Sequence, residues 1–314
     1  MKPVQVHLFH DRYFQLSSQD GKLHLRLFRM SRIDKILRRI PLHTSKGLEI
    51  GPLANPVVKK SENVSIRYVD YADSDSLRKK YADDPNVETS RIVEVDDQWG
   101  EKSLVDLYGP EAFDYVIASH VIEHVPDMIG WLQEIAEILK EGGLLSLAVP
   151  DKRYTFDLQR PVSTPGAFIE AYLRKSIQPG PQAVFDHHAL AADVGALAAW
   201  KETILINDLR PYHSPREAYE KAALAFSSGV YEDSHVWIFT PSSFLDVLQI
   251  FCRLGLCDFV VEDFLDTARN QIEFFVVLKK VSRSCSPEEQ LEDQLESLRM
   301  AVRKTSYAVT WRSS

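Results

Sequence analysis

Short apolar runs alternate with amphipathic stretches through the first half of the chain. Five apolar runs have the length of a β-strand: residues 47–50, 64–69, 92–95, 113–118 and 144–149. The stretches 74–81 and 126–139 between them have helical spacing of apolar residues. This alternation predicts a parallel sheet with right-handed crossover connections. The fifth run is apolar without interruption, which is typical of a strand buried on both faces.

The alternation stops after residue 150. Residues 151–239 are rich in proline, histidine and aromatic residues and show no clear period. A helix is expected to begin at Thr240 and Pro241, because these residue types are typical of a helix start. Two more strands are predicted at 259–264 and 272–280. The link between them is too short for a crossover helix, so they should be antiparallel.

These elements predict an α/β fold with a Rossmann-like, seven-stranded sheet whose last strand is antiparallel. We expect the core domain to span residues 45–280, with a large lid insertion at 151–239 after the fifth strand. An N-terminal extension (1–44) and a charged helical tail (281–314) flank this domain.

Composition narrows the classes of function. The chain carries 37 basic and 45 acidic residues, and this acidity argues against nonspecific nucleic-acid binding. No window reaches the roughly 18 uncharged apolar residues of a membrane span, and the N-terminus lacks the apolar core of a signal peptide. The three cysteines form no CxxC pair and no zinc-site spacing. We therefore expect a cytoplasmic protein without a membrane span.

Acidic and polar residues follow the ends of the predicted strands. They are Glu49, Gly51, Pro52, Asp70, Asp96, Asp97, Ser119 and His120. In a doubly wound sheet such positions converge on one crevice. A dinucleotide-binding turn needs three glycines and no acid beside the pyrophosphate, whereas this turn keeps only Gly51 and places Glu49 next to it. These residue types favour S-adenosylmethionine, which is cationic and has no phosphate, over a nicotinamide cofactor.

With these motifs the sequence resembles the class I S-adenosylmethionine-dependent methyltransferases. The resemblance rests on E-I-G-P at 49–52, Asp70, F-D-Y-V-I-A-S-H-V-I-E-H-V-P-D at 113–127 and L-K-E-G-G-L-L-S-L-A-V-P-D-K-R-Y at 139–154. The chain is similar in particular to the subgroup encoded beside glycosyltransferases in bacterial polysaccharide clusters, because F-D-H-H at 185–188 and H-V-W-I-F-T-P-S-S-F at 235–244 also match. It departs from the family at Pro52 and Ala54, where glycines are more usual.

The resemblance implies that the strand-end residues hold S-adenosylmethionine. Its methionine part would lie beside Glu49, Gly51 and Pro52, and Asp70 would accept both ribose hydroxyls. The adenine amino group would meet Asp96 or Asp97, and the transferred methyl would lie near Ser119 and His120.

A hydroxyl acceptor must lose its proton as the methyl moves, so a base is expected near the fourth strand or in the lid. His120 has the most constrained position, His188 and His235 are the lid candidates, and Asp151 is the alternative base. His124 starts a helix and is expected to be structural. The lid histidines could also bind a metal ion, but they lack a fixed ligand spacing, so no metal site is predicted.

The sequence therefore predicts an enzyme, an S-adenosylmethionine-dependent methyltransferase that O-methylates a sugar or glycan intermediate in polysaccharide biosynthesis. Trp200, Tyr212 and Trp237 in the insertion are candidates for docking a sugar ring, and a glycosyltransferase is a candidate protein partner. Three alternatives stay open. They are a small-molecule N- or C-methyltransferase, a nicotinamide-dependent oxidoreductase, and a noncatalytic cofactor-binding partner of a glycosyltransferase.

Overall fold

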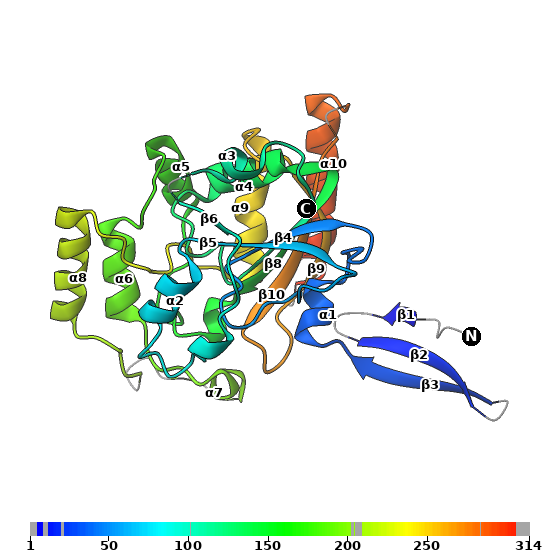
Figure 1. Ribbon diagram of the computed structural model, residues 1–314, viewed down its shortest axis with the longest axis horizontal. Helices are drawn as coiled ribbons and strands as arrows, with labels where there is room; N and C mark the ends of the chain where they lie inside the picture. Colours follow the sequence, from blue (N-terminus) through cyan, green and yellow to red (C-terminus); the bar gives the residue numbers. More distant parts are fainter. Residues whose placement is uncertain are drawn as a thin grey trace, which may run out of the picture.

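A seven-stranded sheet forms the centre of the computed structural model (Figure 1), which describes residues 5–8, 12–19, 22–100, 102–201, 204, 209–282 and 284–305. In spatial order the strands are Asp97–Gln98 (β6), Ser65–Asp70 (β5), Lys46–Ile50 (β4), Phe113–Ser119 (β7), Leu139–Pro150 (β8), Glu273–Lys280 (β10) and Phe259–Leu265 (β9). Strand β10 is antiparallel to both of its neighbours, and the other pairs are parallel. The predicted α/β class and the antiparallel last strand are confirmed.

The alternation of side chains along β7 divides the core into two layers. Val116 and Ala118 belong to a large apolar cluster with the helices Met128–Ile138 (α4) and Pro241–Arg253 (α9). Tyr115 and Ile117 point the other way, into a smaller cluster that includes Ile36 of the short helix Arg32–Ile36 (α1). Both faces of the sheet are therefore covered, which explains the uninterrupted apolar runs.

Two predicted elements differ in the structure, and both differences have a local cause. The third strand is Asp97–Gln98 and not 92–95, because Ile92 packs with Ala54 and Leu77 while the Val95 N–H donates to the Ser74 hydroxyl. Asn55 and Pro56 have the residue types of a helix start, so the sequence predicts a short helix there. That helix is absent, because the N–H groups that follow bind a carboxylate of β4.

The described part of residues 151–239 contains four α-helices: Pro165–Arg174 (α5), Pro181–Leu190 (α6), Ala196–Lys201 (α7) and Pro215–Ser228 (α8). Three of them begin with proline at the first helical position, a start signal that is readable in the sequence. Val184 of α6 packs against Ala222 and Ala225 of α8, and Phe168 of α5 stacks on Trp237 at 4.0 Å. The insertion is therefore a helical layer with its own small core.

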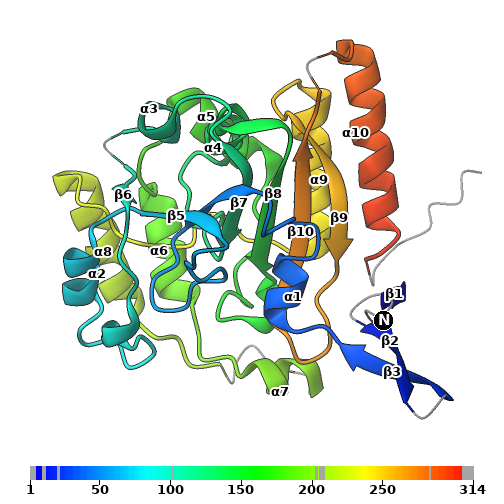
Figure 2. The ribbon, with the colours of Figure 1, turned by 45° about the vertical axis from the view of Figure 1, so that its right-hand side comes forward.

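Smaller elements complete the chain. Helices Ser74–Lys80 (α2) and Leu104–Tyr108 (α3) connect strands of the main sheet. The strands Gln5–Leu8 (β1), Arg12–Gln19 (β2) and Lys22–Arg29 (β3) form a separate antiparallel sheet beside α1 (Figure 2). Helix Pro287–Val302 (α10) covers the edge strand β9, where Ser297 Oγ accepts from the Val261 N–H. No described helix combines the length and apolarity needed to cross a bilayer.

Candidate active site

The parallel register brings the predicted strand-end residues to one edge of the sheet. Ile50 lies opposite Val69 on one side and Ala118 on the other, and Ser119 lies opposite Ala148. Strands β4, β5, β7 and β8 therefore end at nearly the same level. This is the edge at which ligands of open α/β sheets bind.

Glu49 shapes the turn after β4 from inside the protein. Its buried carboxylate accepts the N–H groups of Val57 at 2.6 Å and Val58 at 3.0 Å. Burial raises the pKa of Glu49 to about 7, against the opposing effect of these two donors and of Arg32. The carboxylate thus holds the loop that Gly51 and Pro52 begin. Its contact with the methionine part of a cofactor stays a prediction.

Gly51 adopts a left-handed backbone conformation with φ +65°, and a Cβ there would lie 3.1 Å from Val121 Cγ2. We expect Gly51→Ala to destabilise the protein by about 1–2 kcal/mol, because a Cβ is unfavourable at this φ. Urea denaturation measures this change. Gly166→Ala is the matched control, since a Cβ there meets no atom within 4 Å and φ is not positive. Equal stability of the two variants would contradict backbone strain at position 51.

Asp70 ends β5 with an acceptor oriented toward the same edge. The side chain is buried, and Oδ1 accepts the Tyr71 N–H at 2.8 Å. Burial raises the pKa of Asp70 to about 6. A buried carboxylate with remaining acceptor capacity suits a ligand that brings its own hydroxyl donors. The predicted contact with a ribose is therefore compatible with the structure.

Asp96 and Asp97 are bonded into the protein. Asp96 accepts from Lys60 Nζ at 2.6 and 2.8 Å and from the Tyr68 N–H at 2.7 Å. Asp97 accepts from Arg67 at 2.7 and 2.9 Å and from the Tyr108 hydroxyl at 2.9 Å. These bonds join the loop before β6 to β5. Contact of either acid with an adenine stays a prediction.

Ser119 and His120 are linked to strand β10 through two charged groups. His120 has φ +55°, and its Nε2 lies 2.8 Å from Glu273 Oε2. Arg32 donates to both oxygens of Glu273, at 2.7 and 2.9 Å, and to Ser119 Oγ at 2.6 Å. Burial opposes protonation of His120, but Glu273 and Glu123 give it a net raised pKa. A raised pKa favours the protonated ring, and only the neutral ring can act as a base.

His235 comes from the lid and lies between two carboxylates. Its Nδ1 lies 2.6 Å from Asp157 Oδ2, and Arg160 donates to the other oxygen of Asp157 at 2.9 Å. Burial alone would raise the pKa of Asp157, but His235 and Arg160 lower it to about 2. An ionised Asp157 requires a hydrogen on Nδ1. In the neutral ring Nε2 is therefore the acceptor nitrogen, and it lies 4.0 Å from Glu123 Oε1.

The other two candidate bases face different partners. His188 Nε2 lies 2.9 Å from Glu232, which Lys221 also binds, and burial together with Lys221 lowers the pKa of His188. Asp151 is fully buried and accepts from Arg153 through both oxygens and from Thr267 Oγ1 at 2.8 Å. The structure thus brings His120 and His235 together and leaves His188 and Asp151 in separate networks. The role of each in catalysis stays a prediction.

Glu123 is the residue of this site that sequence reasoning missed. It is fully buried, and neither carboxylate oxygen has a hydrogen-bond partner among the described residues. His120 Nδ1 lies 3.6 Å from Oε1, the same oxygen that His235 approaches. The available signal was its position one residue before His124 and three after His120, directly past the strand end. Such spacing shows proximity, but not that the carboxylate is buried without a donor.

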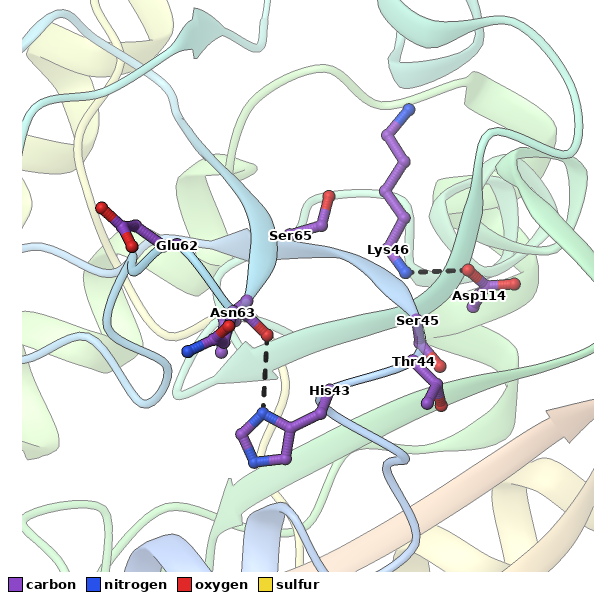
Figure 3. A pocket seen from close by; sticks show the side chains of 9 residues that line it. His43, Thr44, Ser45, Lys46, Glu62, Asn63, Ser65 and Asp114 are labelled. Atoms are coloured by element: carbon purple, nitrogen blue, oxygen red, sulfur yellow. Dashed lines mark hydrogen bonds between the residues drawn. The ribbon is translucent and has the colours of Figure 1, made fainter.

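A shallow hollow of about 820 Å³ lies at the opposite end of the sheet (Figure 3). It is lined by the first residues of β4 and β5, where the Lys46 N–H donates to Asp114 at 2.8 Å. His43 lies there 3.5 Å from the Asn63 carbonyl. None of the predicted site residues lines it, so we assign it no part in the reaction.

A model of the family described as "Methyltransferase domain" matches residues 50–249, which is more than half of the chain. The chain belongs to this family. The chain therefore contains an S-adenosylmethionine-dependent methyltransferase domain, and the expected enzyme class and cofactor are confirmed at this level. The nicotinamide-dependent alternative is set aside. A search of curated protein sequences finds no significant match.

Several solved structures are similar to this chain at low sequence identity. The SeMet-substituted CurJ carbon methyltransferase is 12% identical over 78% of this chain and 51% of its own, with a TM-score of 0.36. A methyltransferase from Aquifex aeolicus is 11% identical over 80% and 90%, with a TM-score of 0.39. A protein described as a Zn-dependent alcohol dehydrogenase from Rhodobacter sphaeroides is 15% identical over 79% and 88%, with a TM-score of 0.43. The methyltransferase spans about half of CurJ. At these scores the three carry no argument about its acceptor.

The residues at this edge fit the cofactor of the family. The methyltransferase has no glycine-rich phosphate cradle after β4, and Asp70 offers a buried acceptor for a diol. Asp70 and the turn at Gly51 would hold the ribose and the methionine part, with Ser119 and His120 beside the methyl. S-adenosylmethionine supplies an activated methyl group on a sulfonium. The protein then has to hold an acceptor atom in line with that methyl, exclude water and manage the acceptor's proton.

Proposed function

We propose that this methyltransferase methylates a hydroxyl group of a sugar or glycan intermediate. The observation that carries the proposal is the pair His235–Asp157, which the lid places against Glu123 just past the end of β7. An amine with a free lone pair needs no base of this kind, whereas a hydroxyl has to lose its proton during transfer. A histidine held by an ionised aspartate suits that task near neutral pH.

Aromatic side chains and the site's polarity support a sugar acceptor. Tyr154, just after β8, stacks on Trp200 of α7 with ring centroids 3.9 Å apart, and Tyr212 is 57% exposed. Such faces combine an apolar surface with a polar edge, as a sugar ring requires. Trp237 has another role, because it is buried against Phe168 and donates to the Val125 carbonyl at 2.6 Å.

The proposal also covers the pathway, the protein partner and the location in the cell. The resemblance to the polysaccharide-cluster subgroup supports a role in polysaccharide biosynthesis, with a glycosyltransferase as partner. A cytoplasmic location is supported by Cys252, Cys257 and Cys285, which are all free thiols.

The test is an acceptor screen with S-adenosylmethionine labelled on the methyl. Nucleotide sugars and oligosaccharides are offered beside matched amino sugars and small amines, and the product is analysed for O-methyl or N-methyl groups. We expect label on a sugar oxygen. Transfer only to nitrogen or carbon would overturn the proposal in favour of the small-molecule alternative. Cofactor binding with no transfer to any acceptor would favour the noncatalytic one.

The lid gives a further prediction. The loop between α5 and α6 is exposed, with Ile177 89% accessible to solvent. We expect limited proteolysis of the free enzyme to cut first near residues 178–182, and cofactor plus acceptor to slow this cut as the lid orders. Mass spectrometry of the fragments locates the site. First cleavage in the strands of the main sheet would count against a mobile lid.

A further inference from the structure

The three residues Glu123, His124 and His235 have ligand atoms that all lie within 4.8 Å of one another. Glu123 and its neighbour His124 lie in the loop between β7 and α4, and His235 comes from the lid. One carboxylate and two imidazoles form a donor set that binds divalent transition metal ions. This set was not expected from the sequence, which predicted no metal site.

The partners of the two histidines determine which nitrogen faces the cluster. His124 Nδ1 lies 2.8 Å from Asp233 Oδ1, and His235 Nδ1 lies 2.6 Å from Asp157 Oδ2. Metal-binding histidines usually donate their second ring N–H to such a carboxylate, which fixes the ring and makes the other nitrogen a better ligand. Both rings therefore have the outer hydrogen bonds of a metal ligand, and Nε2 is the nitrogen left to bind.

The environment of Glu123 also supports a bound cation. A fully buried carboxylate without any hydrogen-bond donor is costly in a folded protein, and both of its oxygens lack one among the described residues. Its oxygen Oε1 is aimed between His235 Nε2 at 4.0 Å and His120 Nδ1 at 3.6 Å. A cation at this position would satisfy the carboxylate that the protein itself leaves without a donor.

The backbone around the cluster is fixed by hydrogen bonds. The Glu123 carbonyl accepts the N–H groups of Val236 at 2.7 Å and Trp237 at 3.1 Å, and the rings of His124 and His235 meet edge to face at 4.6 Å. His124 is about one-third exposed at its side chain, which leaves a path from solvent. Ligand atoms lie about 2.0–2.2 Å from a bound Zn²⁺, so an ion would draw these side chains inward by roughly 1 Å.

We propose that Glu123, His124 and His235 bind one divalent transition metal ion of the Zn²⁺ or Co²⁺ type, with an open position for an oxygen of the methyl acceptor. The inference rests on the proposed hydroxyl methylation for the identity of that oxygen. The ion would polarise the acceptor hydroxyl. The site lies near the proposed cofactor residue Asp70, because Asp233, the partner of His124, is close enough to add to the raised pKa of Asp70 after the larger effect of burial. A nitrogen that binds an ion cannot also accept a proton, so the ion and a His235 base are alternatives.

The test is a titration of the chelator-stripped full chain with Co²⁺ alone, followed by calorimetry and by visible absorption. We expect one ion to bind per chain, and Glu123→Gln and His235→Gln to weaken that binding at least tenfold. His43→Gln, in the hollow at the far end of the sheet, is the control and should bind as the wild type does. Binding of S-adenosylhomocysteine by each variant verifies that it is folded.

Two results of the titration would overturn the inference. One is a wild type that binds no Co²⁺, and the other is a Glu123→Gln variant that binds it as tightly as the wild type. The titration uses no acceptor, so a negative acceptor screen would not change the interpretation of Co²⁺ binding. Conversely, full-rate methylation of a sugar hydroxyl by the chelator-treated enzyme would support the proposed function and refute the ion.

Discussion

Replacing His235 by alanine should lower methyl-transfer turnover by about 10²–10⁴-fold while leaving the affinity for S-adenosylhomocysteine nearly unchanged. The reason is the position of its Nε2, which lies 4.0 Å from Oε1 of Glu123, a residue of the loop between β7 and α4. The variant loses the lid group that handles the acceptor hydroxyl, whether as a base or through an ion. Turnover from product formation and affinity from calorimetry are measured on the same samples.

Three variants make this result specific. His120→Ala should also slow turnover, because it removes the other histidine that lies close to Glu123 Oε1. His43→Ala is the control, since that ring lies at the far end of the sheet. A large loss for His188→Ala with normal His235→Ala would move the base to the Glu232 side of the lid. Turnover within tenfold of the wild type for all of them would mean that no histidine takes part.

Asp70→Ala should weaken binding of S-adenosylmethionine at least tenfold, because it removes hydrogen bonds to a charged acceptor that contribute roughly 1.5–3 kcal/mol each. Affinity in the wild type should also depend on pH. The pKa of Asp70 is about 6, and only the ionised acid can accept both ribose hydroxyls. Affinity should therefore fall as the pH drops through about 6. Calorimetry from pH 5 to 8 measures both effects.

Asp70→Asn separates charge from packing, because it keeps the volume and should lose most of the pH dependence. Asp75→Asn is the control, since Asp75 is an exposed residue of α2 that pairs with Arg78. Unchanged affinity in folded Asp70→Ala would refute the ribose assignment. A pH dependence that persists in Asp70→Asn would point to Glu49, whose pKa is about 7, as the titrating group.

The main sheet could be predicted because its signals are local. Runs such as 113–118 and 144–149 are continuous in sequence, and a short link fixes the antiparallel pair at the end. The third strand was misplaced because Ile92 and Val95 look like strand residues but are used for packing and for a bond to Ser74. The lid helices were missed because several of their apolar side chains, such as Leu173 and Phe226, are exposed and blur the helical period. The proline at position 165, 181 or 215 nevertheless marks the start of three of them.

The site could be predicted only in outline. Topology alone places Asp70 and Ser119 at one edge, and the sequence shows where the strands end. The pairings within the site depend on residues far apart in the chain, such as Arg32 with Glu273 and Asp157 with His235. The lack of a donor for Glu123 among the described residues is a property of packing, since it depends on which side chains surround the carboxylate. Such absences leave no mark in the sequence.

The bridge from Arg32 to Glu273 and Ser119 bears on where this domain can be cut. A boundary at residue 45 follows the start of the sheet, yet a shortened protein beginning there would lack the guanidinium that spans β7 and β10. The carboxylate of Glu273, which is almost fully buried, would keep its contact with His120 but lose its ion pair with Arg32. This loss is expected to destabilise the fold by roughly 1–3 kcal/mol. The segment before the main sheet thus supplies a side chain that holds Ser119 and Glu273 in place. A shortened protein used for activity measurements should therefore include α1.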